Sequence, residues 1–276
     1  MTASATVSDL LGLLDRLAPF SLAEEWDNVG LLIGHSERPV TSILIGLDPT
    51  LALLDEAIER GVDTLITHHP VIFHPLSAVI TDTPGGRFLE AALARQINVI
   101  ACHTNLDSAA AGVSDVLAAG LGLTRITPLL PSPAAPDCGI GRIGAYDSPL
   151  SGSDFLARVS GLLSCPSLAL AGPLPEFVST VAVCGGSGSD FAEAARGRGA
   201  DVYLSAEIKH STARLAQEYE WCILDAGHYF TEQPVVAFLA DRLRQAAQET
   251  GYTWDILKTT TERPPFMHIN CNGSQS

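Results

Sequence analysis

The segment Val62-Asp63-Thr64-Leu65-Ile66-Thr67-His68-His69-Pro70 joins a run rich in apolar and β-branched residues directly to a pair of histidines. A short run of this kind, preceded by Gly61, predicts a buried strand over 62–67. Pro70 biases His69 toward extended backbone, which lets the two neighbouring imidazoles point in different directions. The segment therefore predicts a strand that delivers two histidines at its carboxyl end.

Two further stretches have the same form. His103-Thr104-Asn105-Leu106-Asp107 follows the apolar run Asn98–Cys102, and Gly227-His228-Tyr229-Phe230-Thr231-Glu232 follows the run Trp221–Asp225. In each stretch a carboxylate comes four residues after the histidine, a spacing that puts both side chains on one face of a helix. Since ligands of parallel α/β sheets gather at the carboxyl ends of the strands, all three stretches are expected at such an edge.

Together the three stretches supply six donors, namely His68, His69, His103, Asp107, His228 and Glu232. Imidazole and carboxylate form a donor set that suits Zn, Mn, Fe, Co or Ni. One catalytic zinc usually takes three protein ligands, whereas six donors with a bridging carboxylate suit two ions about 3.5–4 Å apart. A single His-His pair is commonly a loop feature, so it is the threefold recurrence that favours a dinuclear metal site. His74 has two possible interpretations, an outer ligand or proton relay and a surface-loop residue.

Strand and helix patterns alternate along the chain, which predicts an α/β fold. The first half is expected to form a parallel sheet with helical crossovers. Its expected strands cover 42–47, 62–67 and 98–102, and its expected helices cover 8–17, 50–60, 88–95 and 113–121.

A Pro-rich stretch over 128–136 has little periodicity and is expected to be a linker. It would join an N-terminal α/β lobe (1–127) to a C-terminal α/β lobe (137–276). The elements expected in the second lobe are strands over 178–184, 201–204, 221–225 and 252–257, with helices over 154–163, 209–219 and 232–248 and a further helix that follows Asp190 and ends at Arg198.

Composition excludes several classes of function. The formal net charge is −15, from 16 basic and 31 acidic residues, and no basic stripe is present, so a nucleic-acid surface is not expected. No apolar run reaches the length of about 20 residues that a membrane span needs, and the N-terminus lacks the features of a signal peptide. Six cysteines without a CxxC pair are expected to be reduced thiols in the cytoplasm. Cys102, beside His103, is open between a core thiol and a group near the metals.

Three other features bear on a binding site. Trp26-Asp27-Asn28 has two possible interpretations. It lines the mouth of a site, where Trp26 would stack on a purine, or Trp26 is an ordinary core residue. The stretch Gly185–Ser189 is open between an anion seat made of backbone N–H groups and a tight structural turn. No nucleophile elbow of the GxSxG type is present, which argues against serine-type acyl transfer.

The chain resembles the Nif3-like proteins, also named GTP cyclohydrolase I type 2 homologues. The resemblance extends over nearly the whole chain and follows the motif order of that family. The matching motifs are Glu25-Trp26-Asp27-Asn28-Val29-Gly30-Leu31, Thr67-His68-His69-Pro70, His103-Thr104-Asn105-Leu106-Asp107, Cys184-Gly185-Gly186-Ser187-Gly188 and Gly227-His228-Tyr229-Phe230-Thr231-Glu232.

The resemblance implies two Nif3-type α/β lobes with a dinuclear metal site in the cleft between them, assembled as a toroidal homohexamer. It implies that His69 and Asp107 bind one ion, that His68 and His228 bind the other, and that Glu232 bridges both. His103 would be close to the metals without being assigned as a ligand. The chain departs from the family pattern at Ser205-Ala206-Glu207-Ile208-Lys209-His210, which bears on any substrate role of Glu207 or His210.

The function expected from these residues is metal-dependent hydrolysis of a small molecule, with a nucleotide or a phosphoester as the candidate substrate. His103 and Glu207 are the candidates for proton transfer. The family name suggests GTP, although a family does not fix a substrate. The alternative is a non-catalytic role, in metal storage, metal delivery or regulation.

Overall fold

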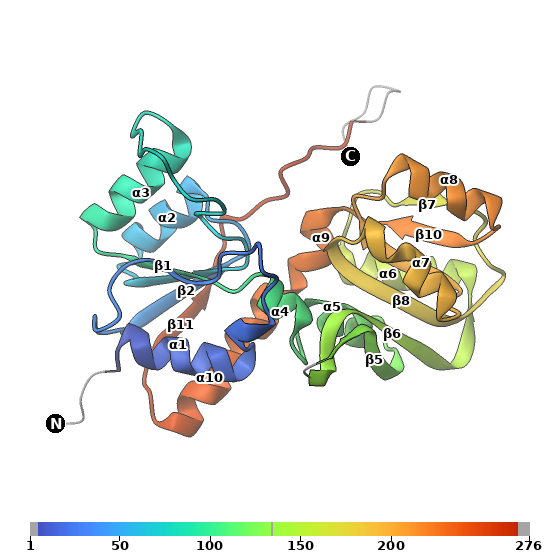
Figure 1. The fold of residues 1–276 in the computed structure, drawn as a ribbon, viewed down its shortest axis with the longest axis horizontal. Coiled ribbons are helices and arrows are strands. Elements are labelled where there is room, and N and C mark those ends of the chain that lie inside the picture. Colours follow the sequence, from blue (N-terminus) through green and yellow to red (C-terminus); the bar gives the residue numbers. More distant parts are fainter. Residues whose placement is uncertain (1–4, 134, 270–276) are drawn as a thin grey trace. The chain divides into compact units, whose positions relative to one another are not determined.

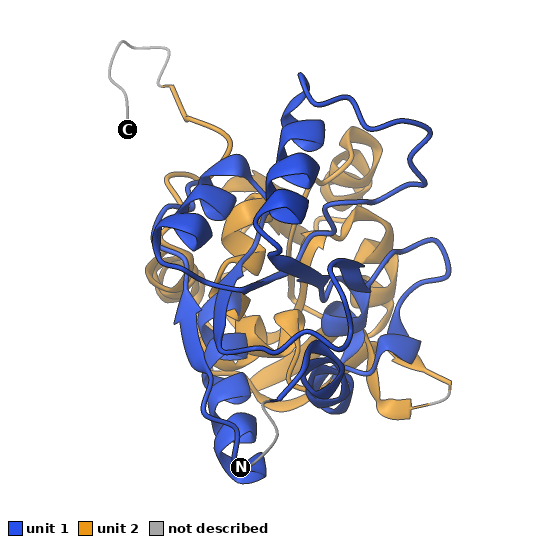
Figure 2. Ribbon diagram, turned by 90° about the vertical axis from the view of Figure 1, so that its left-hand side faces the viewer, with its two compact units in different colours: residues 1–109, 236–263 blue, residues 110–235, 264–276 orange. Residues whose placement is uncertain are grey.

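The structure is a computed structural model that describes residues 5–133 and 135–269. It contains two compact units, coloured separately in Figure 2. Unit 1 comprises the described residues through 109 together with 236–263, and unit 2 comprises 110–235 together with the described residues from 264. The chain thus leaves unit 1, forms unit 2 and returns.

Unit 1 is built around a five-stranded sheet with the strand order β1-β4-β3-β2-β11. Strands β4, β3, β2 and β11 are parallel to their neighbours, and β1 pairs antiparallel with β4. The parallel sheet with helical crossovers that the sequence predicts for the first half is confirmed. The elements of this unit are α1 (Val7–Leu17), η1 (Phe20–Leu22), β1 (Gly30–Ile33), β2 (Ser42–Gly46), α2 (Leu51–Glu59), β3 (Thr64–Thr67), α3 (Pro84–Ala94), β4 (Asn98–Ala101), α4 (Thr104–Ser108), most of α10 (Pro234–Thr250) and β11 (Asp255–Lys258).

Helices cover both faces of this sheet. Figure 1 shows α2 and α3 on one face, with α1 and α10 on the other. Local signals begin the helices, because Thr50 and Thr83 each accept a backbone N–H at an N-cap and Pro84 occupies the first turn of α3. The core under α2 and α3 consists of Leu53, Leu54, Ala57, Phe88, Leu89 and Ala92, packed against Ile33, Leu44, Leu65 and Val99. Helices packed on both faces hold the strands of this sheet in place, including the strand ends that carry the histidines.

Unit 2 contains a six-stranded mixed sheet with the order β5-β6-β8-β9-β10-β7. Strands β8, β9 and β10 are parallel, whereas β5, β6 and β7 pair antiparallel with their neighbours. Its elements are α5 (Val113–Gly120), β5 (Thr124–Ser132), β6 (Ala135–Ser151), α6 (Gly152–Leu163), β7 (Ala169–Ala171), β8 (Phe177–Ser187), η2 (Ser189–Phe191), α7 (Ala192–Gly197), β9 (Val202–Ala206), α8 (His210–Glu218), β10 (Cys222–Asp225) and α9 (His228–Glu232).

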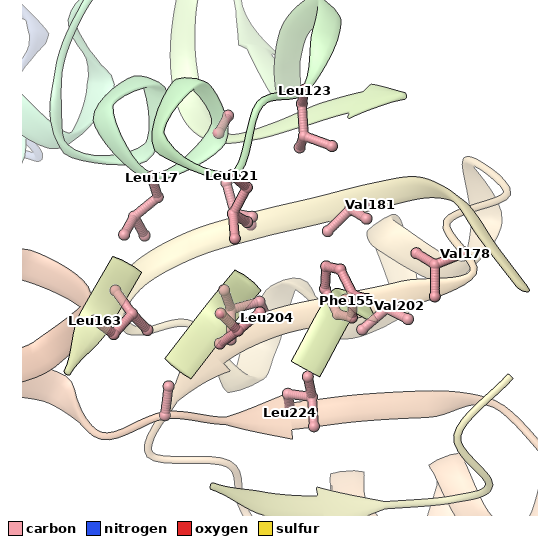
Figure 3. Packing of buried hydrophobic residues seen from close by; sticks show 14 of the residues in the cluster. Leu117, Leu121, Leu123, Phe155, Leu163, Val178, Val181, Val202, Leu204 and Leu224 are labelled. Carbon is pink, nitrogen blue, oxygen red and sulfur yellow. The ribbon is translucent and has the colours of Figure 1, made fainter. Parts of the chain in front are cut away.

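The main core of unit 2 lies between this sheet and helices α5 and α6. Figure 3 shows Leu117 of α5, Leu121 just after it and Phe155 of α6 among valines and leucines from the strands. A second cluster on the other face includes Tyr203 and Ile223, packed with alanines of α7. Since both faces are covered, the central strands read as continuous apolar runs, which is why the sequence predicts them.

The division into units differs from the predicted boundary. The stretch 128–136 was expected to be a linker, but residues 128–132 belong to strand β5 and residues 135–136 to strand β6 of unit 2. Pro128 and Pro131 are tolerated because β5 is an edge strand, where a missing N–H removes no bond from the sheet interior. The strand predicted over 252–257 forms β11, but it pairs with β2 of unit 1 and not with the second sheet. Cys271 lies outside the described residues.

Within the described ranges, no helix combines the length and the apolar character that crossing a membrane requires.

A buried carboxylate fastens the segment after β11 to α2. The Glu56 side chain is 5% exposed and accepts hydrogen bonds from the hydroxyls of Thr259 (2.6 Å) and Thr261 (3.0 Å) and from the N–H of Thr260 (3.1 Å). It also pairs with Arg60 at 2.9 Å. Burial alone would raise the pKa of Glu56, but the hydrogen bonds from Thr259, Arg60 and Thr260 outweigh it and lower the pKa to about 2.

We expect Glu56→Gln to lower the free energy of unfolding by about 2 kcal/mol at pH 7, because the bonds to the ionised carboxylate are lost. The folded pKa lies below the unfolded value, so the contribution is complete above pH 5 and is lost as the pH falls toward 2. Urea unfolding between pH 7 and pH 3 should show the difference from wild type narrowing by about half at pH 3. Glu59→Gln, at an exposed position of the same helix, is the control. A difference that stays constant down to pH 3 would contradict this account.

Candidate metal centre

Three histidines meet at the carboxyl edge of the unit 1 sheet. His68 and His69 follow β3, and His103 follows the neighbouring strand β4. One ring nitrogen from each lies within 4.8 Å of the others, and the ring centroids are 5.0 to 5.4 Å apart. His68 is buried, with 2% of its surface exposed. The expectation that ligands gather at the carboxyl ends of parallel strands, which we call the strand-end rule, therefore predicts this grouping correctly.

Each of these imidazoles is fixed through Nδ1 by an acceptor of its own. His68 Nδ1 lies 2.8 Å from the carbonyl oxygen of Cys102, His69 Nδ1 lies 2.8 Å from Asp48 Oδ1, and His103 Nδ1 lies 2.8 Å from Asp27 Oδ1. Carbonyl and ionised carboxylate oxygens only accept, so Nδ1 carries the proton and Nε2 keeps its lone pair. This is the arrangement by which metal-binding histidines are oriented in proteins.

Asp107 adds a carboxylate to this group. It lies on α4, four residues after His103, and its Oδ1 is 3.6 Å from His68 Nε2. The i,i+4 spacing noted in the sequence is therefore helical here. The resemblance pairs Asp107 with His69, whereas the 3.6 Å separation links it with His68.

Unit 2 holds a second group at the carboxyl end of β10. His228 begins α9 and Glu232 ends it, and His228 Nε2 is 3.0 Å from Glu232 Oε2. His228 Nδ1 lies 2.9 Å from Glu207 Oε1, so this histidine is oriented in the same way as the other three. Glu232 is 3% exposed. A buried carboxylate oxygen 3.0 Å from an imidazole nitrogen is a pair that one cation can bind.

Glu207, a candidate for proton transfer in the sequence, is thus the residue that orients His228. Its backbone has φ +53°, a conformation that costs free energy for a residue other than glycine. The strained turn places its carboxylate against Nδ1 of His228, which explains its position better than a role in chemistry.

The glycine-rich stretch provides room for Glu232. Gly186 has φ +65°, and a Cβ there would lie 2.1 Å from Glu232 Oε1 and 3.3 Å from His228 Nε2. The N–H of Gly186 donates to Thr231 Oγ1 at 3.0 Å. The structure therefore favours the structural reading of Gly185–Ser189, because any side chain at position 186 would occupy the place of the two donors.

The surroundings of His103 favour its neutral form. Burial, reinforced by the neighbouring His68, lowers the pKa of His103 despite its hydrogen bond to Asp27. For Asp27, burial would raise the pKa, but hydrogen bonds from His103 and Thr104 outweigh it and lower the pKa. Neutral imidazole is the form that binds metals and accepts protons. Cys102 is a core thiol, with its pKa raised to about 12 by burial.

The roles of two residues in this region were not predicted from the sequence. Asp48 follows β2 at the same sheet edge and orients His69, so the strand-end rule could have identified it. Glu262 accepts the N–H groups of Leu47 (2.6 Å) and Asp48 (2.9 Å), and burial raises its pKa. No local pattern links residue 262 to residue 48, because the contact depends on β11 joining this sheet.

Trp26 is exposed, at 58%, which excludes the core-packing reading of this residue. Its ring lies 6.3 Å from that of His103 and 5.7 Å from that of Phe73. His74 lies on an exposed loop in contact with Phe73, in agreement with the surface-loop reading.

We expect Asp27→Ala to release His103 from a single tautomer. In wild type, imidazole ¹⁵N spectra of the metal-free protein should show His103 protonated on Nδ1 alone, and the variant should show a mixture of tautomers. Loss of the buried acceptor of the Thr104 N–H (3.0 Å) should also lower stability by about 1–3 kcal/mol. His35 is the internal reference, because its Nδ1 accepts the Glu37 N–H and should report the opposite tautomer throughout. An unchanged His103 spectrum would contradict the role of Asp27.

Comparison with known proteins places this arrangement in a family. The Duf34/NIF3 (NGG1p interacting factor 3) family model matches residues 5–265. A Clostridium acetobutylicum protein named GTP cyclohydrolase 1 type 2 homolog is 33% identical over 264 residues, which cover 95% of this chain and 98% of that protein. A Streptomyces coelicolor protein of the same name is 34% identical over 272 residues, with 95% and 94% covered.

A solved structure agrees with these matches. The crystal structure of a Staphylococcus aureus hypothetical protein has a TM-score of 0.91 and 30% identity to this chain, and the match covers 96% of this chain and 100% of that one. Since the family model spans residues 5–265 and the relatives match over nearly their full lengths, this chain belongs to the Duf34/NIF3 family.

Proposed function

We propose that this protein binds two divalent metal ions and is a metal-dependent hydrolase of a small molecule. The proposed ligands are the residues expected from the sequence, namely His68, His69, Asp107, His228 and Glu232. Zn, Mn, Fe, Co and Ni all suit this mixture of imidazole and carboxylate. Family membership supports the proposal through relatives named GTP cyclohydrolase 1 type 2 homolog.

The observation that carries the proposal is the common orientation of four histidines. His68, His69, His103 and His228 each place Nδ1 against an oxygen acceptor 2.8 or 2.9 Å away. Such bonds fix the ring and make Nε2 more basic, and they accompany metal-binding histidines almost without exception.

Separations inside each unit support part of the proposed assignment of donors. The distance of 3.6 Å between His68 Nε2 and Asp107 Oδ1 supports one ion shared by these two residues. His69 then remains for the ion that His228 binds. Glu232 is proposed as the bridge, because its carboxylate is buried and one of its oxygens lies beside His228 Nε2.

The proposed chemistry is attack by water on an electrophilic carbon or phosphorus. Two divalent ions, when bound, would supply an activated water and stabilise developing negative charge. His103 is proposed to move the proton, because its side chain is 14% exposed and its Nδ1 is held by the buried carboxylate of Asp27. Asp27 would stabilise the imidazolium that forms, as an orienting carboxylate does in other enzymes. A nucleotide or a phosphoester remains the candidate substrate.

A homo-oligomer is proposed as the assembly, with the toroidal hexamer implied by the resemblance as the specific form. The exposed apolar residues Leu76, Val79 and Ile80, adjacent in the chain, support a contact between copies. Analytical ultracentrifugation tests this, and a sedimentation mass of a single chain would contradict it.

Metal content tests the proposed centre. Protein purified without added metal, and again after reconstitution, should contain about two ions per chain by elemental analysis. We expect Glu232→Ala to retain one ion or fewer, because its carboxylate serves both ions, and His69→Ala to lose metal as well. Glu218→Ala, at an exposed position of α8, should retain both ions, and circular dichroism should verify that each variant is folded.

The results separate the candidate functions. Two ions in wild type and in Glu232→Ala would exclude the bridge. No metal in wild type, even after reconstitution with Zn, Mn or Fe, would exclude the metal centre. If two ions are bound, a screen with nucleotides and phosphoesters follows, with His103→Ala as the comparison. Hydrolysis lost in His103→Ala at unchanged metal content would support the enzyme, and no turnover of any substrate would favour metal storage, delivery or regulation.

A further inference from the structure

Two large aromatic side chains lie exposed beside the histidine group of unit 1. Trp26 is 58% exposed and Phe73 is 39% exposed, and their rings are 5.7 Å apart with 51° between their planes. Trp is among the residues most often withdrawn from water, because its ring has a large apolar area. An exposed pair of such rings therefore requires an explanation.

Hydrogen bonds hold in place the two loops that carry these rings. Asn28 Nδ2 donates to the carbonyl of Ile72 at 2.6 Å, which joins the loop carrying Trp26 to the loop carrying Phe73. Asp27, between Trp26 and Asn28, is fixed by the N–H and hydroxyl of Thr104 at 3.0 and 2.5 Å. The backbone on either side of each ring is thus anchored next to the histidine group.

The aromatic pair borders a residue of the proposed chemistry. The His103 ring lies 6.3 Å from Trp26 and 6.1 Å from Phe73, nearly edge-on to both, with interplanar angles of 76° and 69°. Asp27, whose side chain orients His103, is the next residue in the chain after Trp26. A ring stacked on Trp26 would therefore lie next to the histidine group.

We propose that Trp26 and Phe73 form a stacking platform for a planar nitrogen heterocycle of the substrate. This inference rests on the proposed function and narrows its substrate class to molecules with such a ring, such as nucleosides and nucleotides, in place of ring-free phosphoesters. Aromatic platforms bind bases through their faces, and this attraction requires no basic side chain. A chain with a net charge of −15 gains from such recognition, since phosphate groups alone would be repelled.

Binding of guanosine, compared with ribose 5-phosphate as the ring-free control, tests the platform by isothermal titration calorimetry on metal-loaded protein. We expect Trp26→Ala to weaken guanosine binding by about 5- to 100-fold, the loss found when one stacking side chain is removed. Trp26→Phe, which keeps an aromatic face, should stay within about threefold of wild type. Phe177→Ala, at a 59% exposed aromatic position in unit 2, is the matched control and should bind guanosine as wild type does.

Fluorescence gives a second readout that does not depend on removing Trp26. In a Trp221→Phe, Trp254→Phe double variant, Trp26 is the one remaining tryptophan of the chain. Guanosine should quench its emission saturably, and ribose 5-phosphate should leave it unchanged. If the double variant does not fold, the calorimetric comparison of the Trp26 variants still decides.

Three results would overturn the platform. The first is unchanged guanosine affinity in Trp26→Ala with an unchanged sedimentation mass. The second is unchanged affinity with a lower sedimentation mass, which would make Trp26 a contact between copies. The third is no binding of guanosine, adenosine or cytidine by the wild type. Metal content is measured on every sample. Guanosine binding that depends on Trp26 in a protein without metal would support the platform while contradicting the hydrolase, so the two failures are distinguishable.

Discussion

The bond from Nδ1 of each histidine to an oxygen acceptor is the interaction on which the candidate centre depends. A free imidazole rotates about two side-chain torsions and exchanges its proton between two nitrogens, so it offers a metal or a proton no fixed atom. In this protein the carbonyl of Cys102 and the carboxylates of Asp48, Asp27 and Glu207 remove that freedom. Several features elsewhere in the fold support these acceptors. Glu262 binds the backbone around Asp48, Thr104 binds Asp27, and a positive φ angle positions Glu207.

Strand ends give these interactions a common origin. Parallel strands β2, β3 and β4 all finish at one edge of the unit 1 sheet, where Asp48, His68 and His103 leave it in succession. In unit 2, β9 and β10 finish in the same way, and Glu207 and His228 follow them. A histidine and its orienting carboxylate thus come from neighbouring strands in both units, for His69 with Asp48 and for His228 with Glu207. The parallel sheet supplies each ligand together with the group that orients it.

This origin also explains how far the sequence could predict the structure. Strand, histidine and carboxylate follow one another within a few residues, so the grouping of His68, His69 and His103 was predictable from local pattern. The pairing of β11 with β2 has no local signal, and neither the unit boundaries nor the role of Glu262 could be found without it. Prolines such as Pro128 and Pro131 suggest a linker, but the edge strand β5 tolerates them as well. Asp27 lies 76 residues from His103, so its role became evident only when the fold brought the two together.

The carboxylates of the candidate centre account for part of the negative charge of the chain, and bound metal ions would offset it. Two divalent ions, as proposed here, would bring four positive charges. The proposed ligands Asp107 and Glu232 carry two negative charges, and the orienting carboxylates Asp27, Asp48 and Glu207 carry three more. A centre built in this way is nearly neutral when loaded and strongly negative when empty, so metal binding would relieve repulsion among groups that folding concentrates. Near-neutrality also means that a loaded centre would attract a polyanionic substrate only weakly through its net charge. Recognition of a substrate would then depend on contacts that are not ionic, and the exposed rings of Trp26 and Phe73 are contacts of that kind.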